Sequence, residues 1–196
     1  SFAQAQPLSE MEGMLDTSYF AKKHKGHIKI DGVLSEDIWQ QAQKATHFIQ
    51  NFPNDTMLSA ARSEVMVTYD DKFIYFAGTF HNSEKHQKYV TPSLKRDFRG
   101  EANDAIVISI DPFMDRLNSF SFGINPFGVQ REGLVVNGGV VSEDLSLSWD
   151  NKWYSEVTRY PDKWIAELAI PFKSFRYNSN VPWNISFLRQ DIKHNQ

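Results

Sequence analysis

The chain has no cysteine among its 196 residues, and this excludes disulfides, thiol nucleophiles and thiolate zinc sites. It has no excess of basic charge, because 21 lysine and arginine residues face 24 acidic ones, for a net charge of -3. Without a basic stripe we expect no nucleic-acid partner. It also has no run of eighteen apolar residues, so no segment is expected to cross a membrane as a helix.

Signatures of common catalytic sites are missing as well. The sequence contains no GxSxG, HExxH, P-loop or strand-linked GxGxxG motif, and its six histidines are scattered. Acidic residues are abundant, but nothing marks two of them as the carboxylate pair of a glycosidase. We therefore predict no catalytic residues and a function other than catalysis.

What the sequence does contain is a hydrophobic content of 41%, enough for one sizeable core, and an aromatic content of 14%. Residues 1–26 are polar and without sustained periodicity, and we interpret them as an export remnant followed by a lead-in strand. The small-residue pattern of Ala3, Gln4 and Ala5 is typical of the end of a signal peptide. The alternative is a polar terminus without a targeting role. We predict a single domain over residues 27–196, cut from a longer protein.

The periodicity predicts an all-β fold. Alternating apolar and polar residues bounded by Asp, Asn, Gly or Pro predict strands at residues 63–69, 73–80, 104–111, 118–125, 130–136, 155–160, 164–170 and 183–190. The short segments at 70–72 and 125–128 are suited to antiparallel hairpins. One short helix is predicted near residues 35–43, with Ser35 as its N-cap. Many short strands and one helix predict a β-sandwich of two antiparallel sheets, of the jelly-roll or immunoglobulin-like kind.

Four segments carry a family resemblance, namely IDGVLSEDIWQQA at 30–42, EVMVTYDDKFIYFAGTF at 64–80, NDAIVISIDPF at 103–113 and KWIAELAIPF at 163–172. In order and spacing they resemble carbohydrate-binding module family 9. The further runs FSFGINPFGVQREG, WDNKWYSEV and RYPDKWIAELAIPFKSFRY are similar to a subset of such modules that precedes an outer-membrane β-barrel of uncharacterised function. The resemblance implies a secreted, non-catalytic module that captures oligosaccharides or polysaccharides in the periplasm or at the bacterial outer membrane, as part of carbohydrate catabolism.

Sugar recognition needs a flat aromatic ring and planar polar groups that bond hydroxyls. The family resemblance implies a clamp of paired tryptophans, and Trp149 and Trp153 are the candidates, although Trp153 is better suited to the core and Trp149 is the preferred candidate. No tryptophan occurs between residues 40 and 148, where the first tryptophan of a clamp would be expected. For polar contacts we select a set of charged and amide side chains: Arg96, Asp97, Arg99, Asn125, Gln130 and Glu167. Glu167 is also suited to a structural network.

Acidic residues around one predicted strand suggest a cation site. Asp104, Asp111 and Asp115 could offer carboxylate oxygens to Ca²⁺, the ligand type this ion prefers. Their positions at strand ends are more typical of turn formers.

Two alternatives to sugar binding are kept. Related sandwiches bind haem in electron transfer with a methionine or histidine ligand, and of the five methionines we consider Met66 and Met114 for this role. The chain could also be an interaction or plug domain for an outer-membrane barrel encoded further along the same parent chain.

Overall fold

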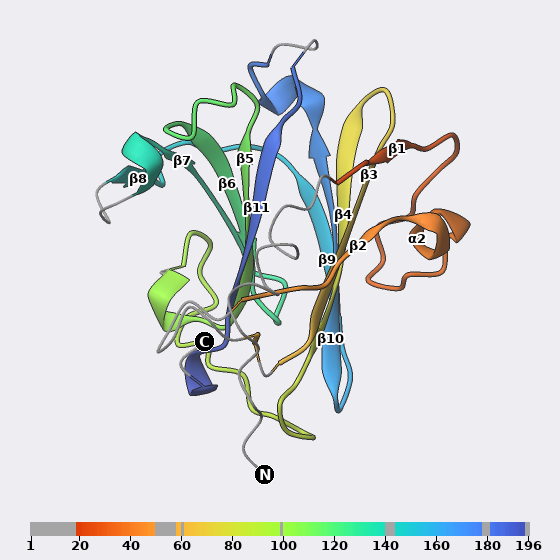
Figure 1. Ribbon diagram of the computed structural model, residues 1–196. Coiled ribbons are helices and arrows are strands. Elements are labelled where there is room, and N and C mark those ends of the chain that lie inside the picture. The colour runs from red at the N-terminus through yellow and green to blue at the C-terminus, as the bar shows by residue number, and fades with distance from the viewer. Residues whose placement is uncertain are drawn as a thin grey trace.

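The computed structural model describes residues 19–49, 58–59, 61–98, 100–139, 144–177 and 181–194. In these residues, two mainly antiparallel β-sheets pack face to face with one short α-helix outside them (Figure 1). This confirms the predicted β-sandwich. Within these residues, no helix has the length and hydrophobicity needed to span a bilayer.

The first sheet has six strands in the order β1-β3-β4-β10-β9, with β2 also pairing with β3. Their bounds are β1 Lys22–Lys23, β2 Lys44–Ala45, β3 Ser63–Tyr69, β4 Phe73–His81, β9 Tyr154–Arg159 and β10 Lys163–Pro171. All pairings are antiparallel except that of β1 with β3. Strand β1 precedes the predicted domain start at residue 27, so the lead-in segment takes part in the sheet.

The second sheet has five strands in the order β11-β5-β6-β7-β8. Their bounds are β5 Ala105–Asp111, β6 Ser119–Ile124, β7 Gln130–Val135, β8 Leu145–Ser146 and β11 Asn184–Gln190. Short 3₁₀ turns are η1 Gly100–Ala102, η2 Asn137–Gly139, η4 Phe172–Ser174 and η5 Ile192–His194. The predicted strands agree with these bounds to within one residue, because the alternation of side chains is a local property of each strand.

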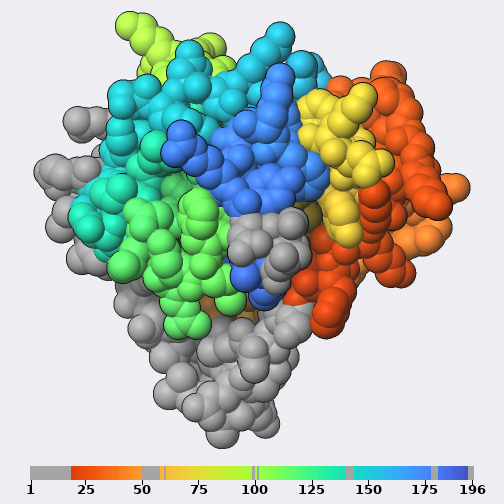
Figure 2. Space-filling model, turned by 90° about the horizontal axis from the view of Figure 1, so that it is seen from above, coloured from red at the N-terminus to blue at the C-terminus, as the bar shows by residue number. Residues whose placement is uncertain are grey.

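The core lies between the sheets and follows from this alternation. In β10, Trp164, Ala166, Leu168 and Ile170 point into the main core, as predicted from their shared face. Ile106, Ile108 and Ile110 face them from β5. The segment after β10 closes one end of the sandwich, where Phe172, Phe175 and Trp183 pack together; it lies between the two sheets when seen from above (Figure 2).

A second, smaller cluster lies on the outer face of the six-stranded sheet. Helix α2 Asp37–Gln41 covers part of this face with Ile38 and Trp39. Its N-cap is Glu36, without a side-chain cap hydrogen bond, and not the predicted Ser35. Residues 27–34 continue across the face with Ile28, Ile30 and Leu34. The outer face is therefore covered in its middle and left open towards the edge strand β9.

Two predicted hairpin turns are present and are held by side-chain oxygens. Asp70 Oδ1 accepts the amides of Lys72 (2.6 Å) and Phe73 (2.7 Å) between β3 and β4. Asn125 Oδ1 accepts those of Phe127 (2.9 Å) and Val129 (3.0 Å) between β6 and β7. Short polar side chains that accept amides two to four residues ahead favour such turns over continued strand.

Candidate binding cleft

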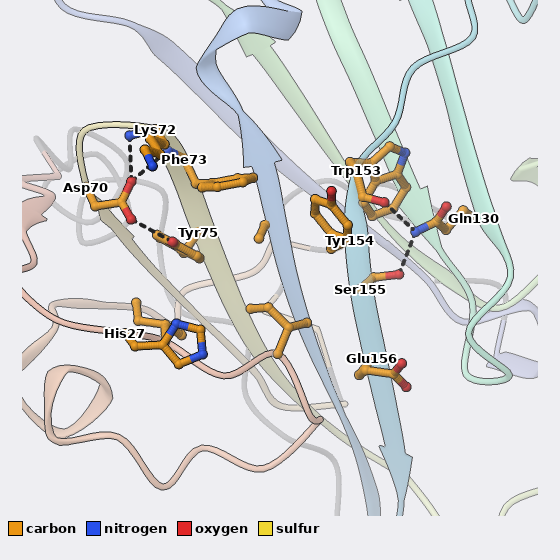
Figure 3. A pocket seen from close by; sticks show the side chains of 13 residues that line it. His27, Asp70, Lys72, Phe73, Tyr75, Gln130, Trp153, Tyr154, Ser155 and Glu156 are labelled. Atoms are coloured by element: carbon orange, nitrogen blue, oxygen red, sulfur yellow. Dashed lines mark hydrogen bonds between the residues drawn. The ribbon is translucent and has the colours of Figure 1, made fainter.

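A cleft of about 660 Å³ opens on the outer face of the six-stranded sheet, between the 27–30 segment and the edge strand β9 (Figure 3). We call it the outer cleft. It is lined by three groups of residues, from the 27–30 segment, from the β3–β4 hairpin and β10, and from β7 with the start of β9: His27, Ile28, Ile30, Asp70, Lys72, Phe73, Tyr75, Gln130, Trp153, Tyr154, Ser155, Glu156 and Ala169. A volume of this size is typical of small-molecule sites.

Strand register explains why a hollow forms here. Ala169 of β10 pairs with Tyr75 of β4 on one side and with Tyr154 of β9 on the other. Side chains paired across antiparallel strands lie on the same face. The small Ala169 therefore lies at the floor between two tyrosines. The row of paired residues gives the cleft an apolar base with aromatic walls.

Tyr154 is the exposed aromatic ring of the cleft. Its side chain is 46% accessible, while Tyr75 beside the floor is 7% accessible. Phe73 supports Tyr154 edge-on, with ring centroids 6.0 Å apart and planes at 65°. Lys152 Nζ lies 5.9 Å from the Tyr154 ring centroid. An exposed ring held by an aromatic neighbour can stack against an apolar ligand face at little entropic cost.

Three polar side chains around this floor make no hydrogen bond or ion pair in the described part of the chain, although Lys72 acts electrostatically on Asp70. The imidazole of His27, the ammonium of Lys72 and the carboxylate of Glu156 are exposed and make no hydrogen bond or ion pair there. In Figure 3, His27 lies on one side of the cleft, and Tyr154 and Glu156 lie opposite it on β9. Hydrogen-bonding groups around an apolar aromatic surface are suited to ligands that are polar at their edges and apolar on one face.

Asp70, by contrast, is fully occupied. Besides its two turn amides, it accepts a hydrogen bond from the Tyr75 hydroxyl at 2.7 Å. Burial opposes ionisation of Asp70, but these hydrogen bonds outweigh it and lower its pKa. Burial, followed by the bond to Asp70, raises the pKa of Tyr75 well above its ordinary value. This pair fixes the wall of the cleft and leaves ligand contacts to other groups.

A buried polar network forms the wall behind β9. Glu132 of β7 is 1% exposed and accepts hydrogen bonds from the Trp153 indole (3.2 Å) and from Arg96. Arg96 also donates to Gln130 Oε1 at 2.6 Å, and Gln130 Nε2 donates to Ser155 Oγ at 2.8 Å. The structure thus brings together three predicted ligand residues, Arg96, Gln130 and Trp153. Arg96 and Trp153 both donate hydrogen bonds to Glu132, and Arg96 also donates to Gln130, so the three residues bond within the protein.

The tryptophan clamp needs correction. Trp153 lines the outer cleft but is only 4% exposed, and its indole packs in the main core, so it is not an open stacking surface. Trp149 is partly buried and packs on Phe120 and Phe122 at 5.2 and 5.7 Å. The sheet places Trp149 outside the cleft lining, because it belongs to the connection before β9 and turns into the space between the sheets. The structure therefore does not assemble the predicted pair as an open clamp.

The remaining polar candidates have structural partners. Glu167 is fully buried on the outer face of β10 and accepts the amides of Asp31 (3.0 Å) and Gly32 (2.8 Å) and the Trp39 indole (3.1 Å). Burial raises the pKa of Glu167 despite these bonds. It holds helix α2 and the 31–32 turn to the sheet.

Asn125 and Asp97 also hold backbone. Asn125 is fully buried at its turn, and Asp97 accepts the amide of Glu132 at 3.3 Å in the loop that covers β7. Predicted Arg99 lies outside the described residues.

The three acidic residues proposed for Ca²⁺ do not meet. Asp104 precedes the seven-residue strand β5 and Asp111 ends it, so the two lie about 23 Å apart at the usual rise per residue. Asp104 accepts the amides of Val90 and Ile192, and Asp111 those of Phe113 and Arg116. Asp115 likewise caps the 115–118 turn through Leu117 and Asn118. Within the described residues, no group of three or more His, Asp or Glu side chains is placed to hold a metal ion.

The methionines considered as haem ligands are also separated. Met66 is 3% exposed and fills the smaller core under α2, whereas Met114 is 49% exposed at the β5–β6 turn. Neither lines the outer cleft. The geometry therefore gives no support to the haem alternative.

Comparison with solved structures gives matches at low sequence identity. A family 9 carbohydrate-binding module from Caldicellulosiruptor kristjanssonii in complex with cellotriose is 14% identical, over 86% of this chain and 74% of that one, with a TM-score of 0.58. A family 9 module from the same organism in complex with glucose is 14% identical, over 85% and 75%, with a TM-score of 0.55. This chain has the fold of the family 9 modules. The resemblance drawn from the sequence is thereby confirmed for the fold.

A third structure has a higher TM-score. It is a proposed carbohydrate-binding protein from Bacteroides uniformis ATCC 8492, 12% identical over 88% of this chain and 83% of that one, with a TM-score of 0.66. No family model matches the chain, and no curated protein matches it significantly.

Sequence reasoning missed the residues that shape the cleft. Tyr154, Phe73, His27, Lys72 and Glu156 were not selected. One signal was present: Tyr154 and Glu156 alternate with Trp153, Ser155 and Val157, so they occupy the outer face once the tryptophan is assigned to the core. His27 and Lys72 join them only through the tertiary fold.

Proposed function

We propose that this chain binds saccharides in the outer cleft without transforming them. One sugar ring stacks on the exposed face of Tyr154, and its hydroxyl groups bond to His27, Lys72 and Glu156. The observation that carries the proposal is the 46% exposed Tyr154 ring beside polar groups that lack partners in the described chain. A pyranose has the matching shape, since one face is apolar and its edge carries hydroxyls.

The fold similarity supports the same ligand class. Two of the similar structures are complexes with cellotriose and with glucose. The outer cleft is open along the edge strand β9, and such an opening suits a short oligosaccharide. We therefore propose neutral gluco-oligosaccharides as the first ligands to test. The proposal includes action outside the cytoplasm, in the periplasm or at the cell surface, as part of a longer protein that handles carbohydrate.

The test is calorimetric titration of the protein with glucose, cellotriose and xylotriose. Removing the ring with Tyr154→Ala is expected to weaken binding about 3- to 10-fold, the contribution of one aromatic stack. Tyr177→Ala is the matched control, since Tyr177 is 44% exposed and lies outside the cleft lining. Its affinity should equal that of the wild type.

Two results would contradict the proposal. One is an absence of binding by the wild-type protein to every neutral oligosaccharide. The other is binding that Tyr154→Ala leaves unchanged, because the ligand would then lie elsewhere. In the first case, affinity for a co-expressed outer-membrane barrel would favour the interaction-domain alternative.

A further inference from the structure

A second polar and aromatic surface lies at the far end of β9 from Tyr154. Arg159 ends the strand five residues later, about 16 Å away at the usual rise of a strand. Three segments meet there: the 82–89 loop, the β6–β7 hairpin and the β9–β10 turn. We call this surface the basic end and define it by Lys85, Lys88, Phe127, Arg159, Tyr160 and Lys163.

Hydrogen bonds join the segments of the basic end. The amide of His86 donates to Pro161 O at 2.6 Å, and the amide of Asn82 donates to Asp162 O at 2.8 Å. The Tyr89 hydroxyl donates to Asn82 Oδ1 at 2.9 Å. The loop and the turn therefore form one continuous surface with a defined arrangement.

Arg159 is held in place by an aromatic ring from the other sheet. Its guanidinium carbon lies 4.2 Å from the ring centroid of Phe127, at the tip of the β6–β7 hairpin. Tyr89 supports Phe127 edge-on, with ring centroids 6.4 Å apart at 88°. Within the described residues, Arg159 makes no hydrogen bond or ion pair, so its donors remain available. A stacked guanidinium is a preorganised fork for a carboxylate.

The charge around Arg159 is positive although the whole chain carries -3. Lys85 and Lys88 are exposed and have no partner in the described chain, and Lys163 lies over the Tyr160 ring at 5.6 Å. The nearby Glu84 is paired with Lys193 at 2.6 Å. Asp162 in the β9–β10 turn is the other carboxylate in the three segments that form the basic end. The basic end is therefore complementary to an anion.

We propose that the basic end binds acidic sugars, with the carboxylate of a uronic acid paired to Arg159. A uronate residue joins an apolar pyranose face to a carboxylate. The basic end offers the guanidinium of Arg159, stacked on Phe127, for the carboxylate, and the 38% exposed Tyr160 ring, with Lys163 at 5.6 Å, follows it in the chain. This site is separate from the outer cleft and does not depend on it. The chain would thus contact a polysaccharide bearing uronate residues at a second point.

The experiment titrates the whole chain with trigalacturonate, cellotriose and hexaglutamate at constant ionic strength. Arg159→Gln is expected to weaken trigalacturonate binding about tenfold, the loss of one charge-assisted bidentate pair. Arg176→Gln, an exposed arginine beyond β10, serves as the charge-matched control and should bind as the wild type does. Tyr154→Ala should leave trigalacturonate binding intact, which separates this site from the outer cleft.

Several outcomes would overturn the assignment. These are absence of trigalacturonate binding in the wild type, equal weakening by Arg176→Gln, loss with Tyr154→Ala but not with Arg159→Gln, or equally tight binding of hexaglutamate. If Arg159→Gln fails to fold, the Lys85→Gln/Lys88→Gln variant provides the same test on an exposed loop. It should weaken trigalacturonate binding by about threefold and leave cellotriose binding unchanged.

Discussion

The buried carboxylate of Glu167 offers a sharp test of how the outer face is held together. Its Oε2 accepts two amides, of Asp31 and Gly32, and its Oε1 accepts the Trp39 indole N–H. In Glu167→Gln, the amide oxygen can keep the two backbone donors. The amide nitrogen then faces the indole N–H, so two donors oppose each other in a site without water access.

The expected cost follows from that one mismatch. A buried donor left without an acceptor costs about 1–3 kcal/mol, and we expect Glu167→Gln to lose this amount at neutral pH. The control is Glu156→Gln, because Glu156 pairs directly with Glu167 across β9 and β10 but is exposed. An exposed substitution of this kind should change stability by less than about 0.5 kcal/mol.

The pH dependence gives a second, independent readout. Burial raises the pKa of Glu167 above its ordinary value of 4.5, so the folded protein retains this proton more strongly than the unfolded chain. Its contribution to stability is then fully present below pH 4.5 and decreases as the pH rises through the raised pKa. Glu167→Gln lacks this component. The difference in free energy of unfolding between the wild type and Glu167→Gln should therefore decrease as the pH rises.

Urea unfolding followed by circular dichroism, at several pH values from acid to neutral, measures both effects. A Glu167→Gln protein as stable as the wild type at neutral pH would refute the donor mismatch. A gap that widens as the pH rises would refute the assignment of burial as the dominant influence on Glu167. Equal losses in Glu156→Gln would show that charge, and not the buried contacts, matters.

Three further changes test the structure in the same assay. Gly32→Ala should destabilise by about 1–3 kcal/mol, because Gly32 has a φ of +76° and an added Cβ would lie 2.6 Å from a neighbouring hydroxyl; an unchanged melt would contradict this. Arg96→Met should cost about 1–3 kcal/mol by leaving the Glu132 carboxylate without its cation, with Lys152→Met as control. Excess Ca²⁺ or EDTA should leave the melting temperature unchanged, since Asp104 and Asp111 hold backbone amides apart from each other; a clear shift would restore the cation site.

The strands could be predicted closely because each depends on a local pattern. The 73–80 prediction is one residue shorter than β4 at its end, and the 164–170 prediction is one residue shorter than β10 at each end. The turn oxygens of Asp70 and Asn125 occur where short polar side chains interrupt the alternation. The helix was predicted at the correct place, but α2 is two residues shorter at each end than the predicted range 35–43. Its stability comes from Trp39 packing on the sheet, and its N-cap is Glu36, which makes no side-chain cap hydrogen bond, in place of the predicted Ser35.

The site could not be predicted to the same extent, because its residues are joined by register between distant strands. Trp153 precedes β9 and looks equally suited to a surface or a core until Glu132 of β7 is placed under its indole. Glu167 is likewise polar on an apolar strand, and only the return of the 31–32 turn to the sheet supplies its donors. Neither partner can be inferred from the neighbouring sequence.

The polar residues that stand out in the sequence lie at strand ends and turns. In the structure they accept backbone amides there, so they are unavailable to a ligand. A conspicuous acid or amide at the end of a strand, such as Asp104 or Asn125, is placed where backbone amides would otherwise be unsatisfied, and both side chains are buried by those amides. Side chains that hold no backbone amide are available to bind a ligand. In the described chain, His27 and Glu156 are of this kind. A binding site on a sandwich of this kind is therefore better sought among exposed side chains beside an apolar floor than among the most conspicuous polar motifs, and Tyr154 with its small neighbour Ala169 meets that description.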